Sequence, residues 1–222
     1  MRLTIGEKRH QNQTVLRNIE LEIPDGQRLV LMGPSGCGKT SLLNIIAGLD
    51  RHYTGACELP PGSRLGYLFQ EPRLLPWRTV YQNLVLAGGR PDLIARLLER
   101  TGLTAHKHKT PGQLSLGMAR RAALARCLAI DPTLMLLDEP LVSLDHAAAE
   151  DLRQLINSLL ADRDDITLIC VTHDAREAIS LGQRVVVLGG SPTVIQADLM
   201  LDGDSSAELL QGRVGSGIVK EG

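Results

Sequence analysis

The sequence predicts an α/β fold built on a mostly parallel β-sheet. Two patterns in the 222 residues indicate this: short apolar runs bounded by turn residues, and helical patterns between those runs. Runs that are apolar on both faces are typical of buried parallel strands, because helices cover both faces of such a sheet. The predicted strands are Arg28–Met32, Thr133–Leu137, Ile166–Val171 and Arg184–Leu188, and the predicted helices are Thr40–Gly48, Leu93–Gly102, Met118–Ala129 and Ala147–Leu160.

The N-terminal segment and the middle of the chain follow different patterns. Apolar and polar residues alternate in Leu3–Ile5 and Ile19–Ile23, which predicts a pair of antiparallel strands at the edge of the domain. Between Glu71 and Leu114 the pattern is mostly helical with Pro and Gly breaks, which predicts a small inserted helical subdomain over residues 71–117. We expect one domain over residues 1–222, with a loosely ordered Gly- and Ser-containing tail from about residue 203 to residue 222.

Composition excludes several classes of function. The formal net charge is -1, and aromatic residues make up 2% of the chain, so neither a basic nucleic-acid surface nor a base-stacking platform is expected. Four widely spaced cysteines give no metal-binding or disulfide pattern and fit a reducing compartment. Residues Met1 to Lys8 contain no signal-peptide run, and no stretch reaches the roughly 20 apolar residues of a membrane helix. Any role at a membrane is therefore expected to involve docking to another protein.

A phosphate-binding loop follows the first predicted parallel strand. The segment matches the Walker A pattern G-x-x-x-x-G-K-[ST] and lies between a strand and a helix, as in P-loop NTPases. Its glycines let backbone N–H groups converge on phosphate oxygens, and the helix N-terminus adds partial positive charge. Lys39 is expected to reach the β- and γ-phosphates, and Thr40 to ligate Mg²⁺. The predicted ATP-binding residues of this loop are Gly33, Pro34, Ser35, Gly36, Cys37, Gly38, Lys39, Thr40 and Ser41.

Two acidic residues end the second predicted parallel strand. Asp138 and Glu139 follow an apolar run, at the strand edge where doubly wound sheets place their ligands. Asp138 is predicted to hold Mg²⁺ through water, and Glu139 to act as the general base that polarises the attacking water. Many strands end in solvated acidic residues that have no catalytic role. The pair is therefore good evidence for an ATPase site only because the chain also contains the phosphate-binding loop.

A histidine follows the third predicted strand. His173 lies directly after Ile166–Val171 and Thr172. Its position allows two interpretations, a cap for the next helix or a sensor of the γ-phosphate. The two other sites at equivalent strand ends favour the sensor.

In this order the motifs resemble the nucleotide-binding domain of ABC transporters over nearly the whole chain. Gln70 stands where the family has its Q-loop glutamine, Leu114–Met118 where it has its signature sequence, and Ser143–Asp145 where it has its D-loop. The resemblance implies that Gln70 contacts Mg²⁺ and water, and that His173 is the switch histidine. It also implies a homodimer, or a pseudo-dimer with a related ATPase subunit, in which two subunits pair head to tail around two ATP molecules. Across the interface, Ser115, Gly117 and Asp145 are expected to contact the partner's nucleotide.

The resemblance also implies membrane partners. The segment Glu71–Val80 looks like that of bacterial importers of nitrate, sulfonates, taurine and related small solutes. Integral membrane permease subunits are expected to dock near Gln70–Val80. A solute-binding protein would act through that permease, and the chain would be peripheral on the cytoplasmic side of the cell (inner) membrane. Trp77, the only tryptophan, would belong either to this docking groove or to a buried anchor of the helical subdomain.

Several residues depart from the family pattern. Leu116 replaces a signature glycine and would be strained if the loop needs positive φ there, in which case Leu116→Gly would raise ATPase activity. His10 replaces the usual aromatic residue beside the adenine, which predicts weak discrimination between ATP and GTP. The helix N-terminus is expected to lower the pKa of Cys37. Arg120, Arg121 and Arg126 are expected to form a solvated helix face.

Four alternative functions stay open at this point. A small-molecule kinase would share the phosphate-binding loop but not the later motifs, and would transfer phosphate to an acceptor other than water. An ABC-type ATPase with a soluble, non-transport role usually carries a coiled-coil insert or a second nucleotide domain. A non-catalytic ATP-dependent module would not need Glu139. The energising subunit of an exporter is the fourth alternative, because the direction of transport is inferred from the resemblance of one loop.

Overall fold

The computed structural model describes residues 1–161 and 163–201. The chain forms two compact units, Met1–Ser63 with Thr167–Gly222, and Arg64–Ile166. We describe each unit by itself, as the first unit and the second unit. The tail predicted for about 203–222 lies outside the described residues.

The first unit contains parallel strands that carry the phosphate-binding loop. Strand β3 (Arg28–Met32) pairs in parallel with β7 (Thr167–Thr172) and with β8 (Arg184–Gly189). Strand β9 (Val194–Met200) pairs antiparallel with β8. All the residues of β7 are buried, as are all but the first of β3 and of β8, so these strands are apolar on both faces.

An antiparallel sheet completes the strands of the first unit. Strand β1 (Arg2–His10) lies between β2 (Gln13–Glu22) and β4 (Tyr53–Glu58). Leu3 pairs with Leu21 and Ile5 with Ile19, and all four side chains are buried. The alternating pattern at the N-terminus therefore predicted this pairing correctly.

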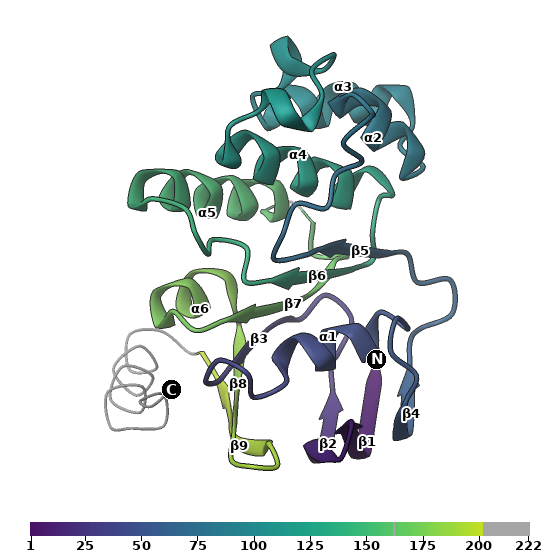
Figure 1. The fold of residues 1–222 in the computed structure, drawn as a ribbon, viewed down its shortest axis with the longest axis vertical. Helices are drawn as coiled ribbons and strands as arrows, with labels where there is room; N and C mark the ends of the chain where they lie inside the picture. The colour runs from purple at the N-terminus through teal and green to yellow at the C-terminus, as the bar shows by residue number, and fades with distance from the viewer. Residues whose placement is uncertain (162, 202–222) are drawn as a thin grey trace. The chain divides into compact units, whose positions relative to one another are not determined.

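Two helices of the first unit follow parallel strands. Helix α1 (Lys39–Ile46) follows the phosphate-binding loop, and helix α6 (Ala175–Leu181) follows β7 (Figure 1). Leu42 and Leu43 of α1 are fully buried. Asp174 caps α6 by accepting a hydrogen bond from the Arg176 N–H at 2.7 Å.

A buried ion pair joins two parts of the first unit. The Lys8 ammonium of β1 lies 2.6 Å from the Asp50 carboxylate, and the side chains are 7% and 25% exposed. Lys8 also donates a hydrogen bond to the His52 carbonyl at 3.0 Å. The pair therefore fixes β1 to the connection between α1 and β4.

The second unit places helices around a short parallel strand pair. Strands β5 and β6 pair in parallel, with Leu68 opposite Leu137. Helix α4 contacts β5 and the three other α-helices of this unit, and Figure 1 shows α2 and α3 beside it. The elements are β5 (Leu65–Leu68), α2 (Val80–Leu86), α3 (Pro91–Arg100), η1 (Thr104–His106), η2 (Pro111–Gln113), α4 (Leu116–Ala129), β6 (Leu134–Asp138) and α5 (His146–Leu160).

The helical character predicted for residues 71–117 is present in α2, α3 and two 3-10 turns, η1 and η2. Thr79 begins α2 with a capping box, since it accepts from the Gln82 N–H at 3.2 Å while the Gln82 side chain accepts from the Thr79 N–H at 3.0 Å. That these residues form an inserted subdomain stays a prediction. In the part of the chain that the structure describes, every helix is too short or too polar to cross a membrane.

Candidate functional site: a nucleotide-binding loop and a carboxylate pair

The phosphate-binding loop joins β3 to α1 and depends on its glycines. Gly36 and Gly38 have φ of 77° and 98°, a backbone conformation that side chains with a Cβ rarely adopt. At Gly33 a Cβ would lie 2.6 Å from the Leu188 carbonyl oxygen, so neighbouring β8 leaves no room for a side chain. The loop can therefore curl tightly, and a curled loop of this kind can turn backbone N–H groups toward an anion.

Lys39 reaches back across this loop. Its ammonium donates to the carbonyl oxygens of Gly33 and Pro34, each at 2.8 Å, and the residue is 5% exposed. A buried cation inside a curled loop is suited to binding phosphate oxygens. Their negative charge makes them stronger hydrogen-bond acceptors for the ammonium than the two neutral carbonyls. Thr40 and Ser41 follow Lys39 at the start of α1.

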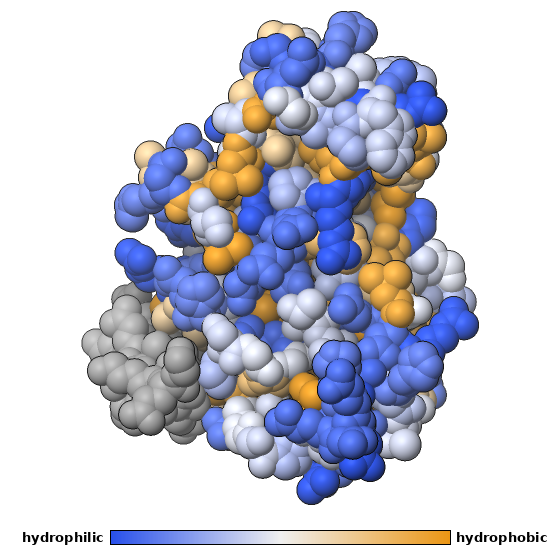
Figure 2. Space-filling model, in the orientation of Figure 1, coloured by the Kyte–Doolittle hydropathy of each residue, from blue (hydrophilic) through white to orange (hydrophobic). Residues whose placement is uncertain are grey.

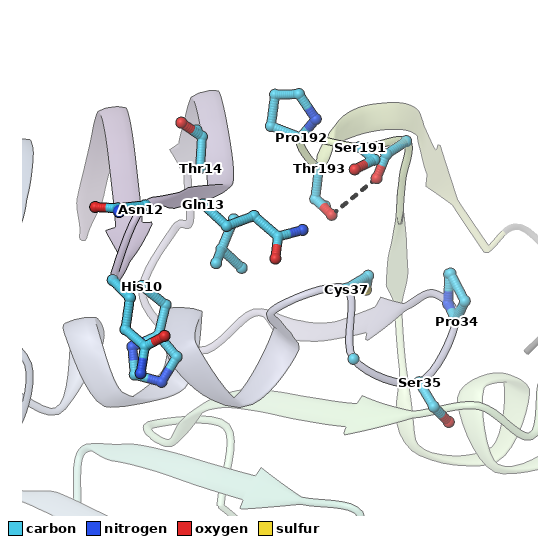
Figure 3. A pocket seen from close by; sticks show the side chains of 14 residues that line it. His10, Asn12, Gln13, Thr14, Pro34, Ser35, Cys37, Ser191, Pro192 and Thr193 are labelled. Carbon is cyan, nitrogen blue, oxygen red and sulfur yellow. Dashed lines mark hydrogen bonds between the residues drawn. The ribbon is translucent and has the colours of Figure 1, made fainter.

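The loop lines a cavity of about 730 Å³ together with the β1–β2 hairpin. His10 ends β1 and lines this cavity opposite the loop residues Ser35 and Cys37, as Figure 3 shows. The structure thus brings His10 and the loop to one pocket, as the prediction of a base-binding side chain requires. A volume of this size is typical of small-molecule sites.

Two further segments line the cavity, and neither was predicted. They are Gln11–Val15 of the hairpin and Gly190–Thr193 of the turn between β8 and β9, where Thr193 donates to the Gly190 carbonyl at 3.2 Å (Figure 3). The Gly-Gly-Ser-Pro sequence of residues 189–192 is typical of a turn, but nothing in it points to contact with the phosphate-binding loop.

The prediction for Cys37 was wrong. Burial raises the pKa of the thiol and outweighs the nearby Lys39 ammonium, which acts to lower it. The side chain is only 9% exposed, so loss of hydration of the thiolate exceeds any stabilisation by the helix N-terminus.

The two carboxylates lie at the end of β6 in the second unit, with Asp138 as its last residue and Glu139 directly after it. Asp138 is 2% exposed, and burial together with the Asp138 charge raises the pKa of Tyr67 on the neighbouring strand β5. Gln70 lies two residues after the end of β5, and Asp138 is the last residue of β6. Because β5 and β6 are parallel, both residues lie at the same edge of this strand pair. Their contact with Mg²⁺ stays a prediction.

Glu139 has an unusual backbone. Its φ is 45°, a left-handed conformation that is uncommon for a residue other than glycine. The Val142 N–H donates to the Glu139 carbonyl at 3.2 Å, which forms a tight turn directly after the residue. Such strain is concentrated at functional positions.

The predicted D-loop, Ser143–Asp145, follows this turn directly. Ser143 also has positive φ, 65°, and Asp145 caps α5 by accepting from the Ala148 N–H at 2.9 Å. The Asp145 carboxylate thus has a structural role within the second unit, while its contact with a partner's nucleotide stays a prediction.

The predicted signature residues begin α4. Ser115 is the N-cap and accepts from the Met118 N–H at 3.3 Å. Leu116 is the first helical residue and is absent from the positions with positive φ, so the strain expected there does not occur. Its side chain is 46% exposed, and at Gly117 a Cβ would meet no atom within 4 Å. This end of α4 is open to a partner.

His173 follows β7 in the first unit and is exposed. Because Thr172 pairs with Met32, the last residue of β3, His173 and the phosphate-binding loop follow neighbouring strand ends. Asp174, rather than His173, caps the next helix. The capping interpretation of His173 was therefore wrong, and the sensor role stays a prediction.

The prediction of a solvated arginine face on α4 was also wrong. Arg120 is 3% exposed, and its Nη2 donates to the Val142 carbonyl at 3.2 Å. Arg126 donates through Nη1 to the Arg73 carbonyl at 2.6 Å and through Nη2 to the Pro72 carbonyl at 3.0 Å. These arginines hold the loops that follow Gln70 and Glu139.

The chain matches the family model described as "ABC transporter" over residues 16–142. It is 41% identical over 202 residues to the Aliphatic sulfonates import ATP-binding protein SsuB 2 of Pseudomonas syringae pv. tomato, covering 90% of this chain and 86% of that protein. It is 40% identical to the protein of the same name in Burkholderia cenocepacia, covering 90% and 77%.

Solved structures agree with this match. A dimeric post-hydrolysis structure of the ATP-binding cassette MJ0796, bound to ADP and Pi, superposes with a TM-score of 0.74 at 28% identity, covering 90% of this chain and 97% of that one. The phosphate-binding loop, the buried Asp138 with Glu139 after it, and these matches lead to one conclusion. The chain belongs to the ABC transporter family and is an ATP-binding subunit whose hydrolysis of ATP powers transport.

Proposed function

We propose that the predicted residues carry out separate steps in the binding and hydrolysis of ATP. Gly33–Thr40 would bind the phosphates, Glu139 would polarise the attacking water, and His173 would sense the γ-phosphate. Two observations carry this proposal, one in each unit. Lys39 is buried in a curled loop of the first unit, and in the second unit a buried Asp138 precedes Glu139, whose backbone is strained.

The residues also fit a magnesium ion. Thr40, Gln70 and Asp138 offer only oxygen ligands, which Mg²⁺ prefers, and the described residues contain no cluster of three His, Cys, Asp or Glu side chains. A single carboxylate with phosphate oxygens is the usual way to bind this ion. When bound, the ion would neutralise charge that develops on the phosphates.

A second copy of the chain, or a related ATPase subunit, would complete the site. Ser115 and Gly117 lie at the N-terminus of α4, where the helix offers N–H groups and partial positive charge to an anion. The dimeric cassette structures among the similar proteins support a dimer for this chain, and a head-to-tail pairing is the arrangement we propose.

Import is the favoured direction of transport, and an aliphatic sulfonate is the favoured class of substrate. The support is that several similar proteins are described as import ATP-binding proteins for aliphatic sulfonates. Substrate binding itself would belong to the permease and to a solute-binding protein. The chain would work at the cytoplasmic face of the cell (inner) membrane as a peripheral subunit.

The segment Gln70–Val80 is the proposed docking site for the permease. Trp77 is 71% exposed, which excludes the buried anchor as its role. Leu86 and Val85 of α2 are 59% and 44% exposed, and Figure 2 shows hydrophobic side chains at the surface in this region. Exposed aromatic and apolar side chains of this kind are typical of interfaces.

Affinity purification from gently solubilised native membranes tests this proposal. The tagged wild-type chain is expected to recover a polytopic membrane protein, and Trp77→Ala to recover several times less. Leu49→Ala is the matched control, because Leu49 is 63% exposed and belongs to the first unit. Recovery of soluble partners alone would contradict the permease and favour a cytosolic role. Loss of sulfonate uptake in cells without the chain would support import, and unchanged uptake would contradict it.

A further inference from the structure

A guanidinium group of α4 is buried without enough acceptors. Arg120 is 3% exposed, and Nη2 donates to the Val142 carbonyl at 3.2 Å. The other two nitrogens, Nε and Nη1, are buried and have no hydrogen-bond partner among the described residues. Burying a charged donor without an acceptor is costly in free energy, so an arginine at this position indicates a partner in another state of the molecule.

Glu71 is the acidic residue whose charge reaches Arg120. Burial lowers the pKa of the guanidinium, and the Glu71 carboxylate acts against this by raising it. Glu71 is exposed, and it makes no ion pair with any residue that the structure describes. The Arg120 guanidinium thus lacks hydrogen-bond acceptors, and the Glu71 carboxylate can supply one.

The segment after Glu71 is fixed to the same helix. Arg126 of α4 holds the carbonyls of Pro72 and Arg73, the two residues that follow Glu71. Glu71 is therefore tethered beside α4 on one side and joined to Gln70 on the other. Its carboxylate can approach Arg120 while the rest of the segment stays attached.

Arg120 also contacts the turn that begins at Glu139. The Val142 carbonyl accepts from Arg120, and the Val142 N–H donates to the Glu139 carbonyl at 3.2 Å. A guanidinium group has five N–H donors in a planar fork, so it can hold a carbonyl and a carboxylate together.

We propose that Arg120 is a positioning residue that receives the Glu71 carboxylate at one of its two unpartnered nitrogens, Nε or Nη1, during the ATPase cycle. The ion pair ties the segment after Gln70 to the turn after Glu139. A movement of the docking segment then changes the position of the general base. This inference rests on the proposed roles of Gln70 and Glu139.

A double-mutant cycle on the full chain tests the pair. Glu71→Gln and Arg120→Gln are each expected to lower kcat at saturating ATP by about tenfold, within the range that residues in contact give. The double variant is expected to lose no more than either single variant, because each change removes the same ion pair. Arg121→Gln is the control on the same helix, and its kcat is expected to match the wild type. A double variant that loses about a hundredfold, the product of the single effects, would overturn the proposal.

A second variant separates positioning from support of the fold. Arg120→Met replaces the buried charge with an apolar side chain of similar length, so kcat is expected to fall while Tm stays equal or rises. A parallel fall of kcat and Tm would identify a structural prop and overturn the proposal. Glu139→Gln, measured beside these variants, isolates the proposed function. If Glu139→Gln still hydrolyses ATP, the general-base role of Glu139 is rejected. If Glu139→Gln is inactive but the Glu71→Gln and Arg120→Gln variants have independent effects on kcat, only the ion pair is rejected.

Discussion

Burial decides the chemistry of Cys37, the cysteine of the phosphate-binding loop. A thiolate needs hydration or a close cation, and at Cys37 the loss of hydration outweighs the effect of Lys39. Its proximity to a helix N-terminus suggested the opposite shift, because the sequence does not show how deeply a loop residue is buried. Cysteine reactivity depends on the thiolate fraction, so this pKa has a direct consequence.

The Cys37 thiol is expected to react slowly with iodoacetamide at pH 7.5 and faster as the pH rises above about 9, since a raised pKa leaves less thiolate at neutral pH. Mass spectrometry of the alkylated peptide measures this rate, and Cys37→Ser provides the blank. Reaction at pH 7.5 as fast as that of a free cysteine would contradict the effect of burial.

Leu116 is a second residue for which backbone geometry changes the prediction. The residue is helical, so Leu116→Gly relieves no strain and is not expected to raise ATPase activity. It is expected to lower stability by up to about 1 kcal/mol, the cost of glycine in a helix. Denaturant unfolding and steady-state hydrolysis measure both effects, and Leu116→Ala separates the loss of the side chain from the freedom of glycine. A higher rate for Leu116→Gly alone would mean that the working state needs positive φ at this position.

At the scale of elements, buried polar links attach strands and helices to the loops that carry the chemistry. Arg126 joins α4 to the segment after Gln70, and Lys8 with Asp50 joins β1 to the connection before β4. Burial raises the pKa of Asp50, but hydrogen bonds from Lys8 and the His52 N–H, with the Lys8 charge, lower it below its ordinary value overall. Removing one partner of such a pair leaves the other charge buried and unpaired.

Asp50→Asn is expected to lower the free energy of unfolding by about 2 kcal/mol at pH 7, because Lys8 keeps a buried charge. A lowered carboxyl pKa stabilises the folded state above the unfolded value, about 3.9, and this contribution is lost as the pH falls through the folded pKa. The difference between wild type and variant should therefore shrink below about pH 4. Urea titrations at several pH values measure it, and a difference independent of pH would reject the ion pair as its source.

At the scale of the whole molecule, the sequence predicted most of the framework. The apolar run Arg28–Met32 matches β3 at both ends, because strands buried on both faces leave an unbroken apolar pattern. The places of Gly33–Thr40 after β3 and of Asp138 and Glu139 at the end of β6 also agree with the sequence, since each motif has a fixed spacing beside an apolar run. The roles of these residues in binding and hydrolysis stay predictions.

Features set by tertiary contacts could not be predicted in this way. Arg120 has the sequence pattern of a solvated helix residue, and only packing against neighbouring loops buries it. Gly190–Thr193 lines the cavity because β8 lies beside β3, a pairing between residues distant in the sequence. The positive φ of Glu139 depends on the turn to Val142, and no glycine marks it.

ATP hydrolysis and dimerisation of Glu139→Gln, measured on one preparation, test the central claim most directly. The account predicts that hydrolysis falls by at least about a hundredfold, the scale of a lost general base, while ATP and Mg²⁺ hold the variant as a dimer in size-exclusion chromatography with light scattering. Ser115→Ala added to the variant should weaken that dimer, because it removes the cap from the helix end that is proposed to bind the partner's phosphates. Hydrolysis by Glu139→Gln at the wild-type rate would contradict the assignment of Glu139, and a monomer in ATP would contradict the shared site.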